Sequence, residues 1–141
     1  MPQYLDRFVA AQATTHDRAL AELRAGRKAS HWMWFVFPQI AGLGRSDTAR
    51  FYAIRDLAEA RAYLAHPLLG PRLHAATAAA IAAPGDAEAI FGGIDAIKLR
   101  SSMTLFAAAA DDPAAFVAVL DRFFGGKRDP ATLALLDEGR G

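Results

Sequence analysis

The residues with the clearest capacity for chemistry surround an aromatic run in the first third of the chain. Trp32 and Trp34 lie within the sequence HWMWFVF. Lys28, His31 and Gln39 bracket that run, so a positive charge, a titratable ring and an amide flank two large stacking surfaces. This combination of residue types would suit recognition of a nucleobase or a ribose.

The same aromatic run has a second interpretation, as part of the hydrophobic core. In a helix Trp32 and Trp34 would point about 200° apart, so the two indoles cannot share a face. Large side chains on opposite faces favour a segment that is buried on both sides, and a buried indole N–H needs a hydrogen-bond partner. The run is therefore either a central part of the core or the wall of a ligand pocket.

A second polar group lies in a segment that is otherwise largely apolar. Lys98, Ser101 and Ser102 are spaced i, i+3 and i+4, which places them on one stripe of a helix. Because burying an unpaired ammonium is costly, Lys98 must extend to solvent, meet an acid such as Asp95, or face a cavity. Ser101 and Lys98 could act as nucleophile and base, and the alternative is a structural polar network.

Several classes of site are disfavoured by residue content and spacing. The chain has no cysteine, and its four histidines lack the i, i+4 spacing of a zinc-binding helix, so we expect no metal site. The loop GLGRS, residues 42–46, lacks the spacing and the lysine of a P-loop, and a glycine turn with a Ser46 helix cap explains it better. No cofactor is predicted.

Charge and hydropathy limit the partners and the location. A formal net charge of +1 gives no field that would attract nucleic acid, and Arg24, Arg27 and Lys28 form too small a basic patch to suggest it. The apolar runs are too short to span a bilayer, and residues 1–12 lack the apolar stretch of a signal peptide. We therefore expect a cytoplasmic protein without membrane contact.

The elements that must position these residues are predicted to be helices. Periodicity and caps indicate an all-α fold, a single compact domain over residues 1–141, with about seven to eight short helices around a buried central helix at roughly residues 94–110. Asp56, Asp86, Asp112 and Asp129 are expected to cap helices, the last two before a first-turn proline. The other predicted helices cover residues 4–12, 14–26, 46–54 and 68–83.

The aromatic run is not expected to form a β-strand. No second β-type segment is present to pair with residues 32–37, and a lone strand would leave its backbone groups unsatisfied. Pro38 stops any helix that reaches it. The run is therefore expected to be helical or a buried irregular turn.

The sequence also resembles a known family. The stretch GRKASHWMWFVFPQ at residues 26–39, followed by GLG at 42–44, resembles the central signature of the bacterial domain of unknown function 1810 (DUF1810). The likeness continues through His66-Pro67, Leu69-Gly70 and Lys98 with SSMTLF at 101–106. This resemblance implies a helical single domain without an established activity. The order of motifs in the carboxy-terminal half also resembles helical families that act on ADP-ribose and related riboside conjugates.

Together these features predict a small-molecule pocket for a nucleotide or an ADP-ribose-type ligand. Its candidate ligand-binding residues are Lys28, Trp32, Trp34, Gln39 and Ser101, and its catalytic candidates are His31, Lys98 and Ser102. Any chemistry would be hydrolysis of a ribosyl bond, although no carboxylate suited to act as nucleophile or base stands out. The sequence leaves open whether the protein is an enzyme; the alternative is a non-catalytic helical protein-interaction module whose partner is unknown.

Overall fold

Helices make up most of the computed structural model, which describes residues 5–140. Within that range there are ten helices and no β-strand, which confirms the predicted all-α class. Tyr4, the expected first residue of the first helix, lies outside the described range. The helices are α1 (Asp6–Gln12), α2 (His16–Arg24), α3 (Met33–Val36), α4 (Asp47–Phe51), α5 (Leu57–Ala65), α6 (Leu69–Ala82), α7 (Ala87–Phe91), α8 (Gly93–Ala109), α9 (Ala114–Phe124) and α10 (Pro130–Arg140).

The helix count exceeds the expected seven or eight. Helices α4 and α7, five residues each, were indicated by their caps at Ser46 and Asp86, whereas α3 is a four-residue turn within the aromatic run. Such short turns produce little periodic signal in the sequence. No helix within residues 5–140 is both long and apolar enough to cross a membrane.

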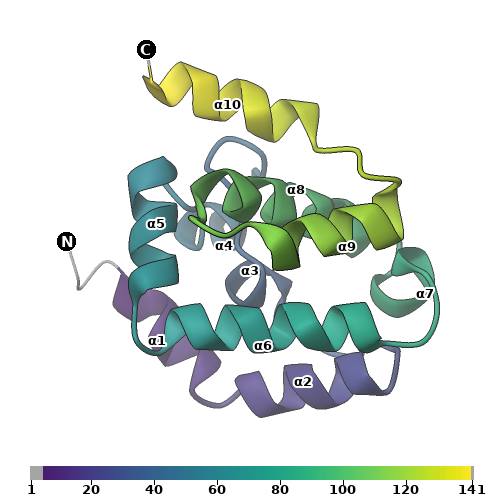
Figure 1. Ribbon diagram of the computed structural model, residues 1–141. Coiled ribbons are helices and arrows are strands. Elements are labelled where there is room, and N and C mark those ends of the chain that lie inside the picture. The colour runs from purple at the N-terminus through teal and green to yellow at the C-terminus, as the bar shows by residue number, and fades with distance from the viewer. Residues whose placement is uncertain (1–4, 141) are drawn as a thin grey trace.

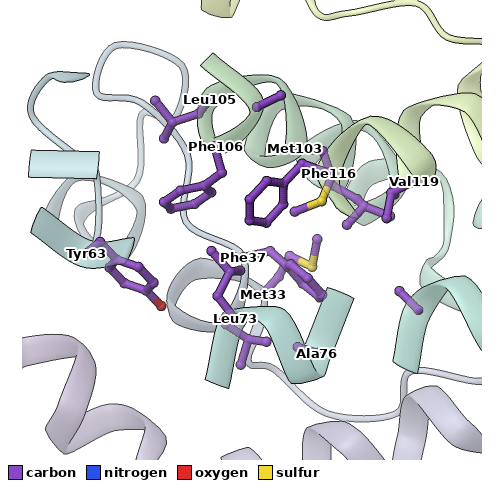
Figure 2. Packing of buried hydrophobic residues seen from close by; sticks show 14 of the residues in the cluster. Met33, Phe37, Tyr63, Leu73, Ala76, Met103, Leu105, Phe106, Phe116 and Val119 are labelled. Atoms are coloured by element: carbon purple, nitrogen blue, oxygen red, sulfur yellow. The ribbon is translucent and has the colours of Figure 1, made fainter. Parts of the chain in front are cut away.

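Helix α8 is the axis of the fold. It packs against α5, α7, α9 and α10, while α6 lies between α2 and α9 (Figure 1). Phe106 on α8 and Phe116 on α9 pack with ring centroids 5.9 Å apart, and Figure 2 shows them above Phe37 and Leu73. Each of these side chains is essentially inaccessible to solvent, and burial of one such side chain contributes about 1.5–3 kcal/mol.

The expectation that α8 is buried holds for most of its length but is wrong at its amino-terminal end. Residues from Leu99 to Ala107 are buried with the sole exception of half-exposed Arg100. Ile94 and Ile97, however, are 74% and 67% exposed. The apolar composition of this end of the helix therefore reflects surface side chains as well as core side chains.

Most helix caps lie at the residues where the sequence predicts them. Asp56 Oδ1 accepts a hydrogen bond from Glu59 N at 2.9 Å, and Asp86 Oδ1 accepts one from Ala89 N at 2.8 Å. Ser46 Oγ likewise accepts from Ala49 N at 3.1 Å, which confirms its capping role. Helix α9 begins at Ala114, one residue later than predicted, and Asp112 accepts from its first N–H.

The aromatic run combines the two conformations considered for it. Met33–Val36 form one helical turn, and the chain then becomes irregular toward Pro38. Ile40 pairs with Ile54 in an isolated parallel bridge, in which Ile54 N donates to Gln39 O at 2.8 Å. This pairing removes Ile54 from the preceding helix, so α4 ends at Phe51 and not at Ile54 as predicted.

Candidate functional site

A groove along one side of α8 brings together several of the predicted residues. It has a volume of about 330 Å³ and is referred to below as the α8 groove. The loop after Pro38, the exposed face of α8 and the start of α10 form its walls. The residues that line it are Gln39, Leu43, Gly44, Ile94, Ile97, Lys98, Ser101, Asp129 and Ala131.

The cationic wall of the groove is Lys98, whose ammonium lies over an indole. Lys98 Nζ is 5.0 Å from the centroid of the half-buried Trp34 ring. The same Nζ is 3.7 Å from Asp95 Oδ1, so the contact with Asp95 that the sequence suggested is present. This ion pair is long, and Lys98 remains 24% exposed. Lys98 therefore keeps hydrogen-bonding capacity on the groove side.

Asp95 makes a closer ion pair with Lys28. Lys28 Nζ lies 2.8 Å from Asp95 Oδ2, and its side chain is only 8% exposed. It also lies 5.2 Å from the centroid of the Trp32 ring. Lys28 thus has its partners inside the protein and does not line the α8 groove, in contrast to its predicted role as a ligand-binding residue.

Trp32 is held in the core by Glu22 of α2. Its indole is fully buried, and Nε1 donates to Glu22 Oε1 at 2.8 Å. Glu22 also accepts hydrogen bonds from Ala29 N at 2.7 Å and from Ser30 N and Oγ at 3.0 and 2.6 Å. Trp32 is therefore a core residue and not a wall of the groove, so of the two indoles only Trp34 lies next to a wall residue.

These four donors keep Glu22 ionised. Burial on its own raises the pKa of Glu22, but the hydrogen bonds from Ser30, Ala29 and Trp32 outweigh this effect and lower the pKa to about 2. The carboxylate therefore fixes the segment that enters α3, and with it the position of Trp34 two residues beyond Trp32.

A second carboxylate, Asp129, joins α10 to α8 at the groove. Its Oδ2 accepts from Ser101 Oγ at 2.9 Å and from Thr132 N at 3.2 Å and Oγ1 at 2.5 Å. Burial raises the pKa of Asp129, but the bonds from Thr132 and Ser101 and the nearby charge of Arg100 lower it overall. Asp129 was expected only as a helix cap, and its place in the groove depends on how α10 docks on α8.

The remaining catalytic candidates do not reach the groove. His31 is exposed and is not among the residues that line the α8 groove. Ser102 is fully buried, and no described residue hydrogen-bonds to its Oγ. The predicted polar stripe therefore divides, with Lys98 and Ser101 at the groove and Ser102 in the core.

Two other surface hollows lie next to the α8 groove. A small one beside Trp34 shares Gln39 and Gly44 with it, and its volume of about 10 Å³ is enough for roughly one water molecule. On the far side of Ile94 and Ile97 lies a hollow of about 670 Å³ that includes Asp86 and Glu88. Arg100 lines the same hollow, so its charge is mixed.

The residues that sequence reasoning missed are mainly carboxylates. Neither carboxylate could be recognised as a site residue from its immediate sequence neighbours, because each acts through a partner on another segment: Trp32 for Glu22 and Ser101 for Asp129. A buried Trp32 needs an acceptor, which did signal that some partner exists. Among the described residues, no three histidine or acidic side chains gather in a way that could hold a metal ion.

Comparisons with known proteins agree with this fold. The conserved hypothetical protein Rv1873 from Mycobacterium tuberculosis, known from a crystal structure, is 54% identical to this chain, with a TM-score of 0.94. The match covers 97% of this chain and 99% of that protein. No curated protein matches the chain. The family model described as "Protein of unknown function (DUF1810)" matches residues 2–136, and the chain therefore belongs to that family.

Proposed function

We propose that the α8 groove binds a small anionic ligand with a planar ring, of the nucleotide or ADP-ribose type. The observation that carries this proposal is the placement of Lys98, which lines the groove while its ammonium lies 5.0 Å from the Trp34 ring. The ammonium offers a site for a phosphate, and the apolar side chains of the same groove offer a surface for a base.

The size and lining of the groove support a small ligand. Its volume of about 330 Å³ falls at the lower end of the range for ligand sites, about 300–1,000 Å³. Leu43, Ile94 and Ile97 supply apolar surface, while Gln39 supplies an amide that can both donate and accept. A largely apolar groove with a few convergent polar groups is typical of ligand sites.

The proposal concerns binding and does not include hydrolysis of a ribosyl bond. His31, the candidate general acid, lies outside the groove, and Ser101 directs its hydroxyl to Asp129. A general acid must lie within hydrogen-bonding reach of the leaving group.

A thermal-shift titration with AMP, ADP-ribose and NAD tests the proposal. A ligand at 100 times its dissociation constant stabilises a protein by about 2.7 kcal/mol, which raises Tm by several degrees. Lys98→Met should abolish the shift, because it keeps the stem over Trp34 but removes the charge. Lys127→Met, at an exposed position outside the groove, is the matched control and should leave the shift intact. If none of the three ligands stabilises the wild-type protein at millimolar concentration, the proposal is wrong.

One observation favours the second candidate, a helical interaction module. Ile94 and Ile97 form an exposed apolar ridge, and the adjoining hollow of about 670 Å³ contains both Glu88 and Arg100. A face with apolar, acidic and basic parts can complement its own copy across a two-fold axis, so a second copy of this chain is the partner that fits.

Sedimentation velocity over a range of protein concentrations tests this candidate. A dimer should form as concentration rises, Ile97→Asp should abolish it, and Leu133→Asp, a change at a 40%-exposed residue on α10, should not. A wild-type protein that stays monomeric at all concentrations would exclude self-association through this face.

A further inference from the structure

The groove contains a cation and an anion that do not pair with each other. Lys98 and Asp129 both line it, and within the described part of the chain no ion pair of 4 Å or less joins them. They are held close because Ser101, which donates to Asp129, lies one helical turn beyond Lys98 on α8. Lys98 faces Asp95 and the Trp34 ring, while Asp129 faces Ser101 and Thr132. A ligand with one anionic end and one hydrogen-bond-donating end can therefore complement both charges.

The hydrogen bonds to Asp129 leave one of its oxygens for that ligand. Ser101 Oγ, Thr132 N and Thr132 Oγ1 all donate to Oδ2. No described residue donates to Oδ1. An ionised carboxylate only accepts hydrogen bonds, and each of its oxygens has two acceptor sites. Oδ1 can therefore accept hydrogen bonds from a pair of neighbouring hydroxyl groups.

We infer that Asp129 selects ligands that carry a ribose diol, with Oδ1 accepting from the sugar hydroxyls while Lys98 holds the phosphate. This inference rests on the proposed function and adds a specificity-determining residue to the same groove. Carboxylates in other nucleotide sites bind the ribose hydroxyls in this way. Repulsion between Asp129 and a phosphate fixes the direction of the ligand, with its anionic group toward Lys98 and its sugar toward α10.

Comparison of AMP with 2′-deoxy-AMP tests the inference on the wild-type protein by isothermal titration calorimetry. Loss of one hydrogen bond to a charged acceptor should weaken binding of 2′-deoxy-AMP by about tenfold relative to AMP. Asp129→Asn should reduce this preference to less than threefold, because the amide replaces an ionised acceptor. The matched control is Asp112→Asn, since Asp112 also accepts from the first turn of a helix but lies outside the groove.

The possible outcomes separate the two proposals. If neither nucleotide binds, this inference is wrong, and the titrations with ADP-ribose and NAD decide separately whether the proposed function is wrong too. If both bind with equal affinity, the groove binds nucleotides but Asp129 does not select for the ribose diol, so only the inference is wrong. The comparison on the wild-type chain needs no variant, so a folding defect of Asp129→Asn, which its Tm would reveal, does not prevent a decision.

Discussion

The hydrogen bonds to Glu22 predict a specific dependence of stability on pH. In the folded protein the pKa of Glu22 is about 2, against an ordinary value of 4.5. Because the folded state favours the ionised form, this carboxylate stabilises the protein above about pH 4.5, and the stabilisation is lost as the pH falls toward 2. Glu22→Gln removes the charge while retaining an acceptor for Trp32, Ala29 or Ser30.

The expected magnitude follows from that difference in pKa. A value of about 2 instead of 4.5 corresponds to about 3 kcal/mol of stability at neutral pH. Glu22 is only partly buried, so solvent screening reduces this figure to about 2 kcal/mol. For a chain of this length such a loss lowers Tm by about 6–8 °C.

Urea denaturation of the wild-type protein and Glu22→Gln at pH 7 and pH 3 measures this effect. We expect the variant to be less stable by about 2 kcal/mol at pH 7, with a clearly smaller difference at pH 3. Glu88→Gln, at an exposed acid on α7, should match the wild-type protein at both pH values. A difference between wild type and Glu22→Gln that is the same at pH 7 and pH 3 would refute the electrostatic explanation.

Two further changes test the packing of the scaffold. In Gly70→Ala the new Cβ would lie 2.2 Å from Leu64 O, a backbone atom that cannot move away easily, so we expect a loss of about 2–4 kcal/mol by urea denaturation. Gly93→Ala, where nothing lies within 4 Å of the new Cβ, should be neutral or slightly stabilising; equal losses in both variants would contradict the steric argument. Arg122→Met removes hydrogen bonds to Ala80 O, Ala83 O and Gly85 O at 2.8, 2.6 and 2.9 Å, and should cost about 2 kcal/mol. Arg18→Met, an exposed change on α2, should have no measurable effect on Tm; an equally stable Arg122→Met protein would show that these bonds are replaced by water.

Local signals in the sequence predicted the helices well. Asp56 and Asp86 begin helices because a carboxylate that bonds to the backbone three residues later is a short-range interaction that residue type alone reveals. The end of α4 was predicted wrongly, because the bridge between Ile40 and Ile54 joins residues fourteen positions apart and depends on the tertiary fold. Ile94 and Ile97 were placed in the core since apolar composition does not distinguish a buried face from an exposed ridge.

The candidate site was predictable only in part. Lys98, Ser101 and Gln39 do meet at one groove, as their residue types suggested. The sequence could not decide which of Trp32 and Trp34 lies in the core and which lies near a pocket, because burial of Trp32 depends on Glu22 from another helix. Asp129 was recognised as a helix cap, but its second role requires the packing of α10 on α8, which no spacing rule describes.

The different surroundings of the two indoles give the protein two intrinsic optical reporters. Trp32 is sealed in the core and hydrogen-bonded to Glu22, so its fluorescence follows unfolding of the α2 and α3 region. Trp34 is half-buried under Lys98, so its emission responds to anything that displaces that ammonium. In a Trp32→Phe protein the remaining signal would monitor the groove, and in a Trp34→Phe protein it would monitor the core. The chain therefore allows occupancy of the groove and loss of structure to be followed separately, without an added dye.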